Sequence, residues 1–92
     1  MKVEQIISDI TFEKKFEKYK QKLTQKERDN LRNKLVIFRD NIFDERLNTH
    51  RLNWKLKDYY SFRITYSDRL KFRIVSDSII MFYDIGSHDQ IY

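Results

Sequence analysis

Residues 59–92 of this chain read YYSFRITYSDRLKFRIVSDSIIMFYDIGSHDQIY, and the pattern of apolar side chains along this stretch decides the fold. Every second residue from Tyr60 to Tyr66 is apolar or aromatic, and the same holds from Leu70 to Ile74. A period of two is typical of strands with one buried face. The nearly continuous apolar run from Ile79 to Ile85 predicts a third strand that is covered on both sides or lies centrally in the sheet.

Two turns set the predicted register of these strands. If the apolar faces of the first two strands coincide, Tyr66 lies opposite Leu70 and the three residues between them form the hairpin loop. By the same logic the second turn is centred on Asp77, with Val75 opposite Ile79.

This register gives the predicted sheet two different faces. The apolar face, on which helices are expected to pack, carries Phe62, Ile64, Leu70, Phe72, Ile74, Ile80 and Phe82. The other face carries Tyr59, Arg63, Thr65, Lys71, Arg73, Met81 and Tyr83. On the second face we expect Arg63 and Arg73 to be cross-strand neighbours. Basic residues interleaved with tyrosines can hold phosphates and stack on bases, as in proteins that read single-stranded RNA.

Two helices are predicted upstream of the sheet. From Phe12 to Leu23, apolar side chains recur with the spacing of one helical stripe, and either Asp9 or Thr11 can cap this helix. The run Thr24–Glu27 has the spacing of a capping box, so a second helix begins there and continues with a stripe from Leu31 to Ile42. The short junction predicts an antiparallel helical hairpin.

The remaining segments complete the predicted fold class. Val3–Ile10 contains four apolar residues and is predicted to be an additional strand, whereas residues 43–58 show no sustained period and are expected to form a connection. Leu47, Leu52 and Trp54 can hold that connection to the core. The prediction is an α+β fold in the order β-α-α-β-β-β: an N-terminal strand and an antiparallel helical hairpin packed on one face of a mainly antiparallel sheet. We expect one domain, residues 1–92.

The positive charge of the chain is concentrated in one segment. Nineteen Lys and Arg against fourteen Asp and Glu give a net charge of +5, and residues 51–73 hold seven basic and two acidic residues, which is the whole excess. A localised positive field beside aromatic rings favours a polyanionic partner such as nucleic acid, or an acidic protein. The alternative is a solvated surface whose arginines pair with Asp58, Asp68 or Asp77.

Several classes of function are excluded by composition. There is no cysteine, no phosphate-cradling glycine loop, no cluster of metal ligands and no carboxylate pair at a catalytic spacing, so no metal or cofactor is expected. No apolar run is long enough for a membrane span, and the first residues do not open a signal peptide, which predicts a cytoplasmic protein.

The remaining chemistry suits metal-free cleavage of RNA. In that reaction the 2'-hydroxyl loses a proton, the charge on the phosphorane is stabilised, and the leaving 5'-oxygen gains a proton. His50 and His88 can exchange protons near neutral pH, and arginines can hold phosphate oxygens with two donors. For each histidine the alternative is a structural hydrogen bond, and for Tyr92 it is a frayed terminal residue.

The order of elements and four short motifs resemble the RelE/ParE superfamily of bacterial toxin–antitoxin toxins, and most of all its RelE and YafQ branch. The motifs are HRL at 50–52, LKDYYSFRI at 56–64, SDRLKFRI at 67–74 and DIGSHDQIY at 84–92. The resemblance covers essentially the whole chain. It implies an endoribonuclease that cleaves mRNA on the ribosome without a metal and is held inactive by a cognate antitoxin.

The resemblance also implies a set of site residues. His50, Arg69 and His88 match family positions, and Asp68, Arg63 and Tyr92 match more loosely. The implied roles are acid or base for His88, its complement or phosphate positioning for His50, and phosphate binding for Arg69 and Arg63. Tyr92 would stack or assist proton transfer.

The expected RNA-binding residues are Lys55, Lys57, Lys71, Arg73, Tyr59 and Tyr83. Two other functions are compatible with the same fold, because function resides in the site and not in the scaffold. One is a ParE-like toxin that inhibits DNA gyrase, and the other is a relative that has lost toxicity and only binds an antitoxin.

Overall fold

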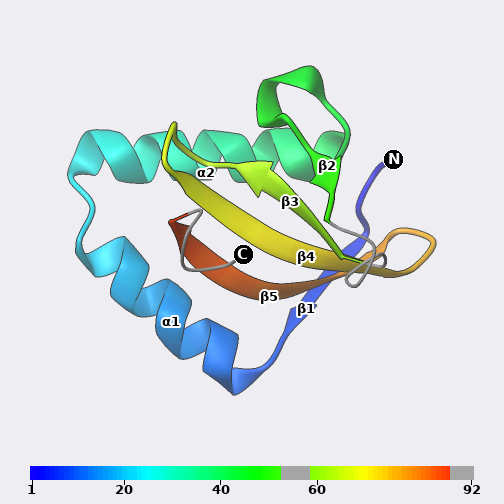
Figure 1. Cartoon of the computed structure of the whole chain (residues 1–92), viewed down its shortest axis with the longest axis horizontal. Coiled ribbons are helices and arrows are strands. Elements are labelled where there is room, and N and C mark those ends of the chain that lie inside the picture. Colours follow the sequence, from blue (N-terminus) through cyan, green and yellow to red (C-terminus); the bar gives the residue numbers. More distant parts are fainter. Residues whose placement is uncertain (53–58, 88–92) are drawn as a thin grey trace.

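The computed structural model describes residues 1–52 and 59–87. Its elements are β1 (Gln5–Ser8), α1 (Ile10–Gln21), α2 (Gln25–Asp40), the 3-10 helix η1 (Glu45–Leu47), β2 (His50–Arg51), β3 (Tyr59–Arg63), β4 (Asp68–Ser76) and β5 (Ile79–Ser87). The described strands form one five-stranded sheet in the order β1-β5-β4-β3-β2, in which β1 is parallel to β5 and the other pairs are antiparallel (Figure 1). The predicted α+β class is confirmed, with β2 as a short strand inside the predicted connection.

Both helices begin where their capping residues predict. The side chain of Asp9 accepts a hydrogen bond of 2.8 Å from the backbone N–H of Phe12, so Asp9 and not Thr11 caps α1. At the start of α2, the Thr24 hydroxyl accepts from the Glu27 N–H and the Glu27 carboxylate accepts from the Thr24 N–H, which completes the predicted capping box.

The hydrophobic core lies between the helices and one face of the sheet, and Phe38 of α2 is at its centre. The Phe38 ring is fully buried and stacks on Phe62 of β3 at 4.7 Å between centroids. It meets Phe72 of β4 edge-on at 4.9 Å and Phe82 of β5 at 5.6 Å. Phe12 of α1 contacts the other side of Phe82 at 5.6 Å. One ring of α2 therefore holds the three longest strands.

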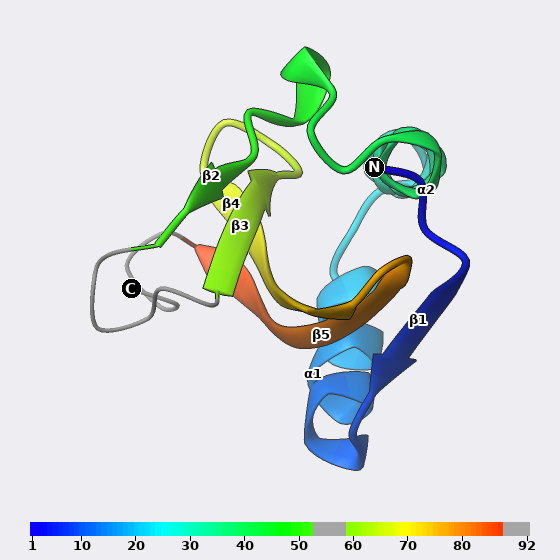
Figure 2. The same cartoon turned by 90° about the vertical axis from the view of Figure 1, so that its right-hand side faces the viewer.

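The other predicted core residues of the sheet also face the helices. Ile64, Leu70 and Ile80 are buried, and Ile74 is partly buried against the same cluster. Figure 2 shows α1 and α2 on one side of the twisted sheet, with β2 at the edge of the sheet farthest from β1. Leu47 and Leu52 are buried as predicted and hold the segment after α2 to the core, whereas Trp54 lies outside the described residues.

The predicted register of the β3–β4 hairpin is wrong by four positions, since Phe62 was expected opposite Ile74. Phe62 lies opposite Leu70 and Arg63 opposite Arg69, so the loop is formed by residues 64–67 and not by 67–69. The alternating pattern places Tyr66 on the apolar face, but in the structure this side chain is 91% exposed. The shift preserves the identity of both faces, because it moves each residue by an even number of positions.

The β4–β5 hairpin follows the predicted register only in its middle. Ile74 lies opposite Ile80 as expected, but a bulge at Val75 places Ser76 opposite Ile79. The register shifts a second time between Lys71 and Phe72. As a result, two residues of β5, Tyr83 and Asp84, separate the buried Phe82 from the buried Ile85, where strict alternation would have one. The turn at Asp77 and Ser78 is attached to β1, since the Ser78 carbonyl accepts from the backbone N–H groups of Glu4 and Gln5.

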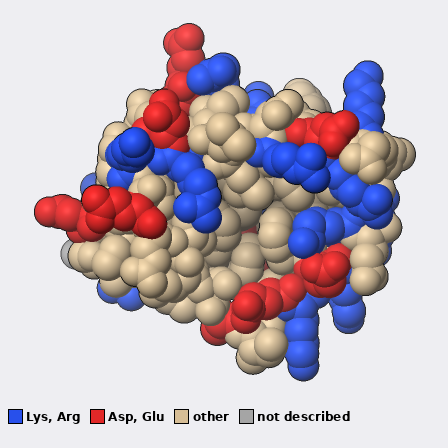
Figure 3. Space-filling model, turned by 180° about the vertical axis from the view of Figure 1, so that it is seen from behind, with Lys and Arg blue, Asp and Glu red and all other residues tan. Residues whose placement is uncertain are grey.

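The charges on the far side of the molecule are mixed. Seen from behind the view of Figure 1, basic and acidic side chains are interspersed and the surface is hollowed near its centre (Figure 3). Neither α1 nor α2 is long and apolar enough to cross a membrane.

The position of Phe38 generates a first prediction. Phe38→Ala is expected to lower the free energy of unfolding by about 3–5 kcal/mol, because it removes the ring that contacts three strands and leaves a cavity. Chemical denaturation with urea measures the loss. The control is Val36→Ala in the same helix, where the side chain is 62% exposed. A loss no larger for Phe38→Ala than for the control would contradict the central role of this ring.

Candidate functional site

The sheet face opposite the helices carries the residues that the sequence assigns to RNA. We call it the basic face and define it by Tyr59, Arg63, Arg69, Lys71, Arg73 and Tyr83. These side chains come from β3, β4 and β5, at positions that alternate with the buried core residues. In the described part of the chain, none of its four basic residues takes part in an ion pair.

Arg63 and Arg69 are the centre of this face. They are directly opposite each other on β3 and β4, whereas the sequence argument paired Arg63 with Arg73, which in fact lies opposite Tyr59. The Nε atoms of both arginines and Nη1 of Arg69 are buried and have no hydrogen-bond partner among residues 1–52 and 59–87. Two like charges facing each other across strands are destabilising, and each unsatisfied buried donor adds a cost. This pair is therefore suited to an anion that both guanidinium groups can contact.

Gly86 lies beside the arginine pair. It is a buried residue within β5 and lies directly opposite Arg69. A glycine adds no side chain at this position, so another group can approach the backbone of β5 closely beside Arg69.

The aromatic part of the basic face lies next to the arginines. The rings of Tyr59 and Tyr83 meet edge-on at 4.9 Å between centroids, and Lys71 Nζ lies 5.7 Å from the centroid of the Tyr59 ring. Although Lys71 is opposite Asp84 in register, Asp84 instead pairs with Lys15 of α1. The structure thus brings Lys71, Tyr59 and Tyr83 together, as predicted for RNA-binding residues.

His50 is positioned by the short strand β2. It lies opposite Ser61 of β3, and Ser61 lies opposite Lys71 of β4, so the three residues form a row across the sheet next to the row of Arg63 and Arg69. Nδ1 of His50 is 3.2 Å from the carbonyl oxygen of Asn48. Asn48 adopts a left-handed conformation, which asparagine tolerates well, at the end of η1.

Asp68 is separated from these residues. It is adjacent to Arg69 along β4 and therefore points to the helix side of the sheet, where its carboxylate accepts a hydrogen bond of 2.7 Å from the Tyr19 hydroxyl of α1. Burial, followed by the bond to Asp68 and its negative charge, raises the pKa of Tyr19. Asp68 therefore connects the β3–β4 loop to α1. It does not neutralise an arginine of the basic face, which was the alternative that the sequence left open.

The predicted site residues Lys55, Lys57, His88 and Tyr92 lie outside the described residues, as does Asp58. Across residues 1–52 and 59–87, no group of three His, Asp or Glu side chains could hold a metal ion.

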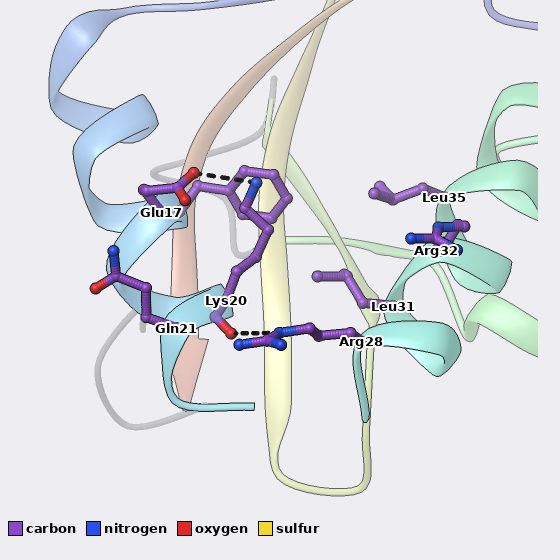
Figure 4. Close-up of a pocket in the computed structure, with 8 residues that line it drawn as sticks. Glu17, Lys20, Gln21, Arg28, Leu31, Arg32 and Leu35 are labelled. Carbon is purple, nitrogen blue, oxygen red and sulfur yellow. Dashed lines mark hydrogen bonds and ion pairs between the residues drawn. The ribbon is translucent and has the colours of Figure 1, made fainter. Parts of the chain in front are cut away.

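A cleft of about 410 Å³ lies on the helix side, between α1 and α2 (Figure 4). Phe16, Leu31 and Leu35 form its apolar lining. Arg28 spans the two helices and donates from Nε to the carbonyl oxygen of Lys20 at 3.2 Å, and Lys20 pairs with Glu17 at 3.1 Å. None of the residues that the sequence assigns to RNA lines this cleft.

Comparison with known proteins identifies the fold. No protein-family model and no curated protein matches the sequence. Among solved structures, a copper-bound mutant toxin from Helicobacter pylori is 20% identical, with 96% of this chain and 98% of that chain covered at a TM-score of 0.73. A YoeB/ParE toxin from Agrobacterium tumefaciens is 14% identical, with 96% and 99% covered at a TM-score of 0.73. A chain of the E. coli DinJ–YafQ toxin–antitoxin complex is 14% identical, with 100% of this chain and 99% of that chain covered at a TM-score of 0.75.

At these identities the comparison concerns the fold. The likeness extends over essentially the full length of this chain and of each matched chain. The RelE-like arrangement expected from the sequence is therefore confirmed as the architecture of the chain.

The Tyr19–Asp68 bond generates a second prediction, on pH. The folded-state pKa of Tyr19 is above its ordinary value of 10.0, so the unfolded chain releases this proton first as the pH rises. The Tyr19–Asp68 bond therefore contributes its full stabilisation of the fold below about pH 10. This contribution declines progressively as the pH rises from there through the higher folded-state pKa. Tyr19→Phe should flatten this decline in urea unfolding between pH 8 and 11. Tyr66→Phe, at an exposed tyrosine, should leave it unchanged, and equal slopes for both variants would contradict the assignment.

The arginine pair generates a third prediction. Arg69→Met removes one of two facing charges, so it should raise the thermal midpoint in chloride buffer by several degrees, as a gain of ~1 kcal/mol does in a small domain. Sulfate at matched ionic strength should stabilise the parent more than this variant. The control is Arg73→Met, an exposed arginine of the same face, which should retain the sulfate response. A destabilised Arg69→Met that still responds to sulfate would refute an anion site here.

Proposed function

We propose that this chain is the toxin of a bacterial toxin–antitoxin system in the RelE/ParE superfamily, and that it is a cytoplasmic endoribonuclease that cleaves mRNA on the ribosome. The observation that carries the proposal is the facing pair Arg63 and Arg69, with three buried guanidinium nitrogens that have no partner in the described part of the chain. A phosphodiester supplies the negative oxygens that such donors require. Toxins with the same architecture support the assignment.

The basic face supports RNA as the class of substrate. Lys71 and Arg73 extend the positive charge from the arginine pair along β4, and Tyr59 and Tyr83 add aromatic surface beside them. Cationic side chains that follow a backbone, with rings that can stack on bases, are the common elements of single-strand binding. Both helices pack on the other face of the sheet, so neither of them covers the basic face.

The proposed cleavage places the scissile phosphate between Arg63 and Arg69, which stabilise the charge that builds on its oxygens. His50 is one strand away and two residues along, so by sheet spacings its Cα lies roughly 8 Å from that of Arg63. The Asn48 carbonyl oxygen accepts from Nδ1 of His50 and so orients the imidazole ring. His50 is the proposed general base for the 2'-hydroxyl.

The complementary step requires an acid. His88 is the proposed donor of a proton to the leaving 5'-oxygen, and Tyr92 is proposed to stack or to assist that transfer. Arg63 and Arg69 are proposed to bind the phosphate, while Lys55, Lys57, Lys71 and Arg73 hold the backbones of the mRNA and ribosomal RNA. Asp68 has no step in this mechanism, because its carboxylate is bonded to Tyr19 on the helix side.

A cognate antitoxin is the proposed protein partner. The DinJ–YafQ complex shows a toxin–antitoxin pair that includes a chain with this fold. The whole excess of positive charge lies in residues 51–73, so an acidic segment laid across the basic face would neutralise it and block access to RNA.

The proposal predicts the outcome of induced expression. The parent should stop growth and translation, and transcripts should carry cuts in phase with codons. His50→Ala and His88→Ala, each confirmed as folded, should lower cleavage by about 100-fold or more, which is the usual contribution of an acid or base. Sequencing of transcript ends measures both effects.

Two results would contradict this function. DNA damage and filamentation with intact mRNA would indicate a ParE-like gyrase inhibitor. Unchanged growth with soluble protein present would indicate a module that only binds an antitoxin. A third result, undiminished toxicity of folded His88→Ala, would refute only the role of His88 and would leave the proposed function standing.

A further inference from the structure

Tyr66 is the most exposed large hydrophobic side chain in the described part of the molecule. It is 91% exposed, whereas the next most exposed such side chain, Ile10, is 63% exposed. The alternating pattern predicts Tyr66 in a strand with its ring on the apolar face, but the observed register places it in the loop that joins β3 to β4. At this exposure the ring contributes nothing to the core, so its whole face is accessible to a partner.

The loop that carries Tyr66 is well anchored. Within it, the Ile64 N–H donates to the Asp68 carbonyl at 3.0 Å, and the Asp68 N–H donates to the Thr65 hydroxyl at 3.1 Å. From the helices, Asn30 of α2 donates to the Ile64 carbonyl at 2.9 Å, and Tyr19 of α1 donates to Asp68. Residues on both sides of Tyr66 are therefore held, and the ring is presented at low entropic cost to a partner.

The position of the loop points to the partner. Tyr66 is three residues after Arg63 and three residues before Arg69, so it extends the sheet directly beyond the arginine pair. A nucleotide whose phosphate contacts these arginines has its base within a few ångströms of that phosphate. An exposed aromatic ring beside a phosphate-binding pair is the arrangement by which single-stranded RNA is held.

We infer that Tyr66 stacks on the base of a nucleotide adjacent to the phosphate held by Arg63 and Arg69. The inference rests on the proposed function and adds to it a positioning residue, which orders the RNA strand so that the scissile phosphate stays in register with the arginines. The ligand is an unpaired base with an exposed face, because a base inside a duplex has no face available for the ring.

The test measures cleavage of a defined mRNA bound to ribosomes by Tyr66→Ala, Tyr66→Phe and Tyr66→Leu. Loss of one stacking contact of the usual strength should lower kcat/KM of Tyr66→Ala by about 5- to 100-fold. Tyr66→Phe keeps the ring and should stay within about threefold of the parent, whereas Tyr66→Leu keeps apolar bulk without an aromatic face and should resemble Tyr66→Ala. Val36→Ala is the matched control, since it shortens an exposed apolar side chain on α2.

A second measurement identifies the stacked base. Abasic nucleotides are placed one at a time around the cleavage position of the mRNA, and each is tested with the parent and with Tyr66→Ala. At the stacked position, the abasic substitution should slow the parent but should add little to the defect of Tyr66→Ala, because both changes remove the same contact. The thermal midpoint of the variants should equal that of the parent, since the ring is exposed.

The outcomes separate this inference from the function on which it rests. If the parent cleaves, Arg69→Ala does not and Tyr66→Ala cleaves like the parent, the stacking role is refuted and the proposed function stands. The stacking role is also refuted if Tyr66→Ala weakens only the binding of the antitoxin. It is refuted again if the cleavage defect of Tyr66→Ala adds fully to the defect of every abasic substitution. If the parent itself cleaves no mRNA in this assay, the proposed function and the stacking role both fall.

Discussion

The packing of Phe38 against three strands is the interaction on which the rest of the structure depends. The ring belongs to α2, but its contacts are with Phe62, Phe72 and Phe82 of β3, β4 and β5. Once these alternate residues are committed to the core, the residues between them must point to the opposite face. The basic face is thus a direct consequence of aromatic packing on the other side of the same strands.

The two sides of the sheet differ in how well their polar groups are paired. Polar groups on the helix side are hydrogen-bonded, whereas the basic face brings two like charges together. On the helix side, the caps of α1 and α2 and the bonds from Asn30 and Tyr19 leave the helix starts and the β3–β4 loop hydrogen-bonded. On the basic face, Arg63 and Arg69 confront each other with unpaired nitrogens. Local conflict of this kind, in an otherwise consistent structure, is typical of functional sites.

Much of the architecture could be predicted because it follows from short-range patterns. The capping box of Thr24 and Glu27 acts over three residues, and the alternation within β3 and β4 requires only neighbouring positions. The site was predicted less completely. Lys71, Tyr59 and Tyr83 do come together, but Arg69 was not expected opposite Arg63, and Tyr66 was not expected in solvent. The one available signal for Tyr66 was its place beside the polar residues Ser67 and Asp68, which are common in turns.

By itself, the sequence determined the two faces of the sheet and the helical hairpin that covers one of them, since periodicity decides which side chains share a side. Only the tertiary structure decided which residues of β3 and β4 face each other. The register of β3 on β4 depends on bonds from Asn30 and Tyr19, which are more than thirty residues away along the chain and cannot be recognised in a local pattern. In the structure these bonds hold the loop at residues 64–67, where Arg63 lies opposite Arg69 and Tyr66 is exposed beyond them.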